Sequence, residues 1–171
     1  MLITTCILPM IMSVQNEYSK ETIMIINKIQ AKGMLSVVLK DSDGNTKDQR
    51  ILNNLIVDTG LAYITSRMED ATATAMNYMA VGTGTTAAAA GDTALVTELD
   101  RNVVTSATAT GASIVYVGTW AAGDGTGAIT EAGIFNASSA GDMLARTVFS
   151  VITKDANDTL SITWTITLSA S

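Results

Sequence analysis

Residues 160–168 read LSITWTITL, in which large apolar side chains alternate strictly with serine or threonine. Because successive side chains of a β-strand point to opposite faces of its sheet, this period of two predicts a strand with one face in a core and a hydroxyl-rich face outward. We expect this strand to be central in its sheet, with Ile162, Trp164 and Ile166 in the core.

The preceding segments have the same strand-like character and are separated by glycine and aspartate at roughly ten-residue spacing. Residues 34–40 and 50–57 flank the turn sequence DSDGN, whose Asp-Gly and Gly-Asn steps favour a tight β-hairpin. Residues 143–153 and 159–168 are expected to form a final hairpin. The remaining predicted strands span residues 76–81, 102–110, 112–120 and 128–135.

Two helical segments are also predicted. Asp58 or Thr59 can cap a helix of roughly ten residues that continues to Met68 with apolar side chains at helical spacing. A single helical turn over residues 95–99 is expected after the low-complexity loop at residues 82–91.

Residues 24–171 are therefore expected to form one domain of mainly β structure. About eight strands without a repeated β-α-β pattern predict an antiparallel β-sandwich of jelly-roll or Greek-key type with one short helix. The length of 171 residues suits a single domain whose hydrophobic core needs no disulfide or metal to support it.

Residues 1–12, MLITTCILPMIM, form an apolar run that is too short for a bilayer, which needs about twenty residues. The run also lacks the charged start and the cleavage site of a signal peptide, so we expect no membrane association. Two interpretations stay open for residues 1–23. Either translation begins at a later methionine, or the segment is an N-terminal arm that packs on a neighbouring subunit. The arm's candidate attachment residues are Leu2, Ile3, Ile7 and Leu8.

Composition argues against most enzymes and against nucleic acid as a partner. The chain has no histidine, which excludes histidine-based catalytic triads, histidine-zinc sites and the usual general base near neutral pH. Its net charge is −6, and residues 68–171 hold ten acidic but only three basic side chains, which repel a phosphate backbone. The single cysteine, Cys6, reads as a buried, unreactive thiol. We expect a protein that is not an enzyme and has no cofactor or metal.

Two short motifs match ligand sites only in part. Asp41 and Asp43 before Gly44 lack further acidic ligands at the spacing of a calcium loop. The GTGT sequence at residues 82–85 lacks the lysine of a phosphate-binding loop. We interpret both as turn or loop chemistry.

Four charged residues in the β-rich part stand beside apolar strand sequence, where an unpaired buried charge costs several kcal/mol. They are Glu98, Arg101, Glu131 and Arg146. We expect at least one Glu–Arg pair among them to be buried and to order the loops. The alternative is four ordinary surface charges at strand ends.

Two longer stretches carry a resemblance to a known family. They are residues 80–101, AVGTGTTAAAAGDTALVTELDR, and residues 125–168, GTGAITEAGIFNASSAGDMLARTVFSVITKDANDTLSITWTITL. In combination they resemble the small virion structural proteins of tailed bacteriophages, in which a VGTGTT loop precedes GDTAL and TEL, and a GxITEAGIFN segment precedes MLARTVF. The resemblance extends over residues 34–168.

The resemblance implies a virion component, expected to be a capsid decoration or cement protein, or alternatively a tail, collar or fibre-attachment component. Its partners would be other virion proteins, such as the major capsid protein or tail proteins. From the residues themselves, flat strand edges with little charge and no proline in the β-rich part predict a homo-oligomer, with a trimer favoured. The alternative from another class is a carbohydrate-binding β-sandwich, in whose hydrolytic version Glu98 and Glu131 would be the carboxylates.

Overall fold

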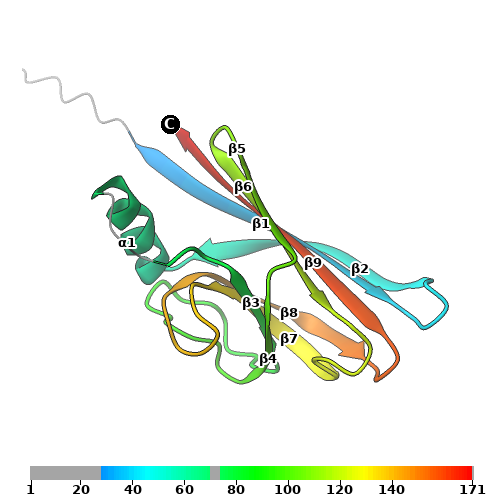
Figure 1. Ribbon diagram of the computed structural model, residues 1–171. Helices are drawn as coiled ribbons and strands as arrows, with labels where there is room; N and C mark the ends of the chain where they lie inside the picture. Colours follow the sequence, from blue (N-terminus) through cyan, green and yellow to red (C-terminus); the bar gives the residue numbers. More distant parts are fainter. Residues whose placement is uncertain (1–27, 70–73, 171) are drawn as a thin grey trace, which may run out of the picture.

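The computed structural model describes residues 28–69 and 74–170, which form nine antiparallel strands and one short α-helix (Figure 1). The strands join edge to edge into one sheet with the order β4-β3-β7-β8-β2-β1-β9-β6-β5. Their bounds are β1 Ile29–Lys40, β2 Thr46–Ile56, β3 Tyr78–Gly82, β4 Glu98–Val103, β5 Ser106–Thr110, β6 Ser113–Trp120, β7 Gly127–Phe135, β8 Met143–Lys154 and β9 Thr159–Ala170. The helix α1 spans Asp58–Ser66 and continues into the 3-10 turn η1, Arg67–Glu69.

The strand β9 lies in the interior of the sheet, paired along its length with β1 on one side and β6 on the other. Trp164 stands opposite Leu35 of β1 and Tyr116 of β6, so three large side chains meet on the inward face. Ile162 and Trp164 are 0% exposed, and Ile166 is 3% exposed. The alternation in the sequence therefore corresponds to one buried face and one outward hydroxyl face.

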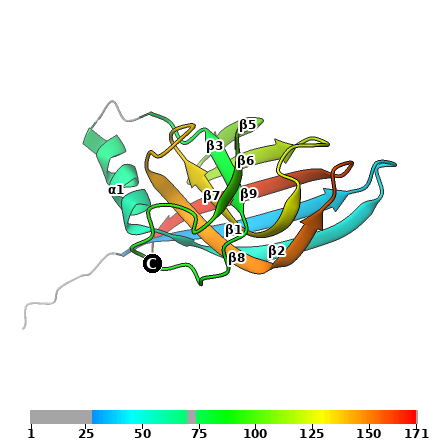
Figure 2. The same cartoon turned by 90° about the horizontal axis from the view of Figure 1, so that it is seen from below.

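The sheet curls back on itself, and β2 forms the corner. Over most of its length β2 pairs with β1, whereas Leu55 and Ile56 at its end pair with Arg146 and Ala145 of β8. From this corner β1 and β8 diverge into two facing halves, and Figure 2 shows β7 and β8 crossing β1 and β9. The main core lies between the halves, with side chains from β1, β6 and β9 on one side and from β3, β7 and β8 on the other.

The mainly β, antiparallel character and the short helix agree with the sequence. The structure shows one continuous curled sheet, and neither a jelly roll nor a sandwich of two separate sheets is shown in the described residues. The physical reason is that β2 keeps backbone hydrogen bonds to both halves, so strand pairing is not interrupted at the corner.

Three local predictions need correction. The helical turn expected at residues 95–99 is wrong, because residues 95–97 form no helical turn and β4 begins at Glu98. The final hairpin is also wrong: β8 pairs with β7 and β2, while β9 pairs with β1 and β6, so the chain passes from one half of the sheet to the other between them. The predicted strand at residues 102–110 is divided into β4 and β5 by Val104 and Thr105.

The first hairpin and the helix are confirmed. The chain reverses between β1 and β2 at a turn in which Gly44 has a φ of +84° and the Asp41 carboxylate accepts the backbone N–H of Asn45 at 2.8 Å. The predicted cap by Asp58 or Thr59 is wrong, because Val57 stands at the N-cap position and no side-chain hydrogen bond caps α1. Instead, the Thr59 hydroxyl donates to the carbonyl oxygen of Met143 at 2.8 Å, which attaches the helix to β8.

The first prediction concerns the inward face of β9. Trp164→Ala should lower the free energy of unfolding by about 3–5 kcal/mol, because it removes a fully buried side chain and leaves a cavity. Thr165→Ala, on the outward face of the same strand, is the matched control and should cost less than about 1 kcal/mol. Urea unfolding followed by circular dichroism measures both. Equal losses in the two variants would contradict this assignment of the faces.

Candidate functional site

A third layer covers the outward face of β3, β7 and β8. It is formed by residues 83–97, the long connection between β3 and β4, which we call the covering loop. Leu95 of this loop packs with Ala80, Phe135 and Met143 in a second, smaller core. One face of this half of the sheet is thereby buried by irregular backbone, whose polar groups need partners.

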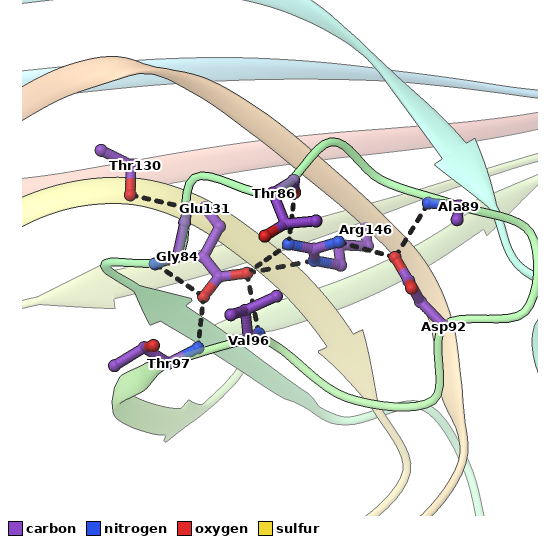
Figure 3. A network of polar contacts seen from close by, with 9 residues as sticks. All are labelled: Gly84, Thr86, Ala89, Asp92, Val96, Thr97, Thr130, Glu131 and Arg146. Carbon is purple, nitrogen blue, oxygen red and sulfur yellow. Dashed lines mark hydrogen bonds and ion pairs between the residues drawn. The ribbon is translucent and has the colours of Figure 1, made fainter.

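Beneath the covering loop lies an ion pair between Glu131 of β7 and Arg146 of β8 (Figure 3). The Nε and Nη2 atoms of Arg146 donate to Glu131 Oε2 at 3.0 and 2.8 Å. Both side chains are 0% exposed. A charge removed from water is tolerated only when it is paired and its remaining hydrogen-bonding atoms are satisfied. The covering loop supplies those further partners.

Three backbone N–H groups of the covering loop donate to Glu131. Those of Gly84 and Thr97 reach Oε1 at 2.9 and 2.8 Å, and that of Val96 reaches Oε2 at 3.1 Å. The hydroxyl of the preceding residue, Thr130, donates to the carbonyl oxygen of Gly84 at 2.8 Å. The two ends of the covering loop are thus joined at a single carboxylate.

Arg146 holds the middle of the same loop. Its Nη1 donates to Asp92 Oδ2 at 2.6 Å, and its Nη2 donates to the carbonyl oxygen of Thr86 at 2.9 Å. Asp92 in turn accepts the backbone N–H of Ala89 at 2.9 Å. Figure 3 shows the guanidinium between the carboxylates of Glu131 and Asp92, with the loop passing around it.

Glycine is required where the loop meets the carboxylate. A Cβ atom at Gly84 would lie 2.4 Å from Glu131 Oε1, and one at Gly82 would lie 2.7 Å from the same oxygen. Real Cβ atoms do not approach so closely, so a side chain at either position would displace the carboxylate. The GTG sequence at residues 82–84 therefore serves the close approach of the backbone to Glu131.

Glu98 and Arg101 form a second pair, on the edge strand β4. Arg101 Nε donates to Glu98 Oε1 at 3.0 Å, and Nη1 donates to the carbonyl oxygens of Ala137 and Ala140, each at 2.9 Å. The Arg101 guanidinium also lies 3.7 Å from the centroid of the Phe135 ring, a cation–π contact. The Glu98 side chain keeps 35% exposure, so this pair is only partly buried. It orders the turn between β7 and β8.

The carboxylates of the buried network are held in their charged form. Burial raises the pKa of Glu131, but the backbone N–H of Thr97 and the guanidinium of Arg146 outweigh burial, so its pKa lies below the ordinary value. The N–H of Ala89 and the same guanidinium lower the pKa of Asp92. A carboxylate that is ionised, enclosed and fully engaged with the protein suits a structural clamp better than proton transfer.

The structure thus brings the four predicted charged residues together as two pairs. Sequence reasoning missed that Asp92 belongs to the buried network, although an acid inside an alanine-rich loop is a signal for such a role.

Within residues 28–69 and 74–170, no group of three or more potential metal-ligating side chains is found, and no helix is long and apolar enough to cross a membrane. The attachment candidates Leu2, Ile3, Ile7 and Leu8 lie outside the described residues.

The second prediction tests the buried pair. Arg146→Met should lower the free energy of unfolding by about 3–5 kcal/mol, because it leaves the Glu131 carboxylate buried without its counter-charge. Lys40→Met is the control, since it removes one positive charge from an exposed side chain at the end of β1, and it should cost about 1 kcal/mol or less. Denaturant unfolding measures both. Hydrogen exchange should also accelerate across the covering loop in Arg146→Met alone, and unchanged loop protection would contradict the clamp.

The third prediction concerns acid. In the folded protein the pKa values of Glu131 and Asp92 lie below their ordinary values of 4.5 and 3.8. Between the folded and the ordinary pKa values, the unfolded state therefore binds more protons than the folded state. The stability that these carboxylates contribute above about pH 4.5 is lost as the pH falls through their folded-state pKa values. Asp41, Asp48 and Asp158 also have lowered pKa values, so the wild type alone does not isolate the network. Unfolding free energies of wild type and Glu131→Gln, measured from neutral pH down to about pH 3, should show a shallower loss in the variant. Parallel curves would refute the role of Glu131.

Comparisons of the chain with protein-family models, with curated proteins and with solved structures found no match. The covering loop and its buried ion pair are therefore interpreted from their own geometry.

Proposed function

We propose that the protein is a non-enzymatic structural subunit of a tailed-bacteriophage particle, a decoration or cement protein that acts through contacts with copies of itself and with other virion proteins. The sequence resemblance at residues 80–101 and 125–168 supports the proposal, as does the use of the buried charges to hold a loop. In this proposal the two facing halves of the sheet serve as a sandwich-type scaffold. The observation that carries it is a broad outward face whose two central rows carry no charge, with Lys32 and Lys40 in the rows toward its ends.

This face belongs to β5, β6, β9, β1 and β2. Residues that stand directly opposite each other in neighbouring strands point to the same side of the sheet, so the strand registers define rows of side chains across the face. We call this surface the hydroxyl face. Its two central rows are Ser106, Val117, Thr163, Ser36 and Ile51, and Thr108, Val115, Thr165, Met34 and Asn53.

No side chain in these rows is charged, although the chain as a whole carries a net charge of −6. Two copies can therefore approach through the hydroxyl face without bringing acidic residues together. Met34 and Ile51 on it are 50% and 68% exposed, which gives apolar area to bury. The adjoining edge strand β5 is exposed throughout and has no charge or proline to block pairing. These features support a homo-oligomer, with a trimer favoured.

The geometry gives little support to the carbohydrate-binding alternative. Trp120 and Trp164 are both 0% exposed, so neither indole can stack on a sugar ring. Glu131, one of the two carboxylates nominated for hydrolysis, is enclosed beneath the covering loop. A tail or collar component is the second candidate function. It differs from a capsid decoration protein in the number of copies expected in each virion.

The fourth prediction tests the hydroxyl face. The wild type should be an oligomer in solution, and Thr165→Lys should dissociate it, because it places a like charge from each copy at the centre of the interface. Thr153→Lys, an exposed threonine on β8 away from this face, is the control and should leave the oligomer intact. Native mass spectrometry and light scattering report the mass. A wild type that stays monomeric at high micromolar concentration would overturn self-association.

The copy number in purified virions, by quantitative mass spectrometry, tests the location. A count on the order of hundreds supports a capsid decoration protein, whereas a count of about six to eighteen supports the tail or collar alternative. Absence of the protein from particles would overturn the virion proposal as a whole.

A further inference from the structure

A pocket opens at the end of the curled sheet where β1 begins. Its volume is about 220 Å³, and it lies between α1 and the strands β5, β6 and β9. Most of its wall is apolar and comes from Ile64, Ile114, Tyr116, Ile166 and Leu168. Figure 1 shows α1 and the start of β1 at the same end of the molecule. The pocket is thus an extension of the main core that the described residues leave open.

The size and chemistry of the pocket favour aliphatic side chains as its occupant. Pockets for small-molecule ligands usually have volumes of about 300–1,000 Å³, so this one is small for a ligand but suits one or two side chains. Burial, and secondarily the nearby Tyr63, raises the pKa of Tyr116 to about 12, so the wall disfavours an added negative charge. The occupant should be uncharged and apolar.

The chain itself supplies such a segment. Residues 1–12, MLITTCILPMIM, carry no charged side chain and present more continuous apolar surface than a soluble protein normally leaves uncovered. The described structure begins beside the pocket: Ala31 of β1 stands directly opposite Leu168, one of the pocket's lining residues. The apolar run therefore joins the fold next to an apolar pocket.

We propose that this pocket binds the apolar residues 1–12 of the same chain, with residues 13–28 as the connection. A connection of that length can span up to about 50 Å, whereas neighbouring strands are only about 5 Å apart, so the reach is ample. A tethered segment has an effective concentration on the order of mM, which favours its own pocket over that of a second copy. This assignment differs from the neighbouring-subunit contact that the sequence suggests, and it does not depend on the proposed virion function.

The opposite end of the sheet offers a matched control. A second apolar pocket there, of about 210 Å³, is lined by Val38, Trp120, Ala121 and Leu160, among others. Along β9, Leu160 and Leu168 are about 27 Å apart at the usual rise of a strand. A segment that merely adheres to apolar surface would visit both pockets, whereas a docked segment occupies one.

Cys6 is the only cysteine of the chain and lies inside the proposed docking segment, so it reports the segment's position. Ala109→Cys adds a thiol at the rim of the proposed pocket, and Ala121→Cys adds one at the control pocket; both alanines are exposed. The full chain, with Met1 verified by intact mass, is oxidised gently at low protein concentration. Non-reducing electrophoresis and peptide mass spectrometry then identify the disulfides.

The proposal expects an intramolecular disulfide between Cys6 and the new thiol in Ala109→Cys, in a yield severalfold above that in Ala121→Cys. Disulfide-linked dimers in Ala109→Cys would overturn the proposal, because they would show that residues 1–12 of one copy bind the pocket of a second copy. Equal yields in the two variants, or no cross-link in either, would overturn docking at this pocket.

A second measurement needs no added thiol. In the wild type, Cys6 should react with a thiol reagent at least about tenfold more slowly than in the urea-unfolded chain, because docking shields it. Ala109→Arg should restore fast reaction by blocking the rim, while Ala121→Arg should not. Circular dichroism checks that both variants keep their fold. Fast reaction of the native wild type, or equal rates in the two arginine variants, would refute the proposal.

Discussion

The buried ion pair between Glu131 and Arg146 sets a constraint that much of the structure satisfies. Two charges without exposure to water need partners for each remaining donor and acceptor, and the neighbouring strands use their own backbone groups in the sheet. The covering loop supplies N–H groups to one charge and a carbonyl and a carboxylate to the other. One pair of side chains thereby determines the path of the covering loop, residues 83–97, which is rich in glycine, threonine and alanine and lacks regular structure.

The corner at β2 relates this clamp to the outer surfaces of the molecule. Because Leu55 pairs with Arg146 at the point where β2 leaves β1, the clamp stands beside the bend of the sheet. The half that carries the clamp is covered on its outward side by the loop, whereas the half that contains β9 presents the hydroxyl face. The charges of the clamp are therefore enclosed by the loop, whereas the central rows of the hydroxyl face carry no charge.

The candidate site could be predicted from the sequence only in part. Glu131 and Arg146 attract attention because each interrupts apolar strand sequence, and a buried Glu–Arg pair follows from the cost of an unpaired charge. An acid inside an alanine-rich loop marks Asp92 as a candidate, but its partner and the contacts of the Gly84 backbone depend on distant residues that set the conformation of the loop. The helical turn expected at residues 95–99 fails for the same reason: the N–H groups of Val96 and Thr97 bond to Glu131 instead of entering a helix.

The sequence by itself determined which face of β9 is buried, where the first hairpin turns and that one short helix follows it. These properties depend on the period of side chains along a strand and on the backbone preferences of a few turn residues, both of which are local. The tertiary structure alone decided that β8 and β9 separate, that β2 joins the two halves into one sheet and that Arg146 meets Glu131 beneath the covering loop. Any strand edge offers the same hydrogen-bonding groups to any other strand, so the choice of partner depends on how the whole sheet curls to enclose its core.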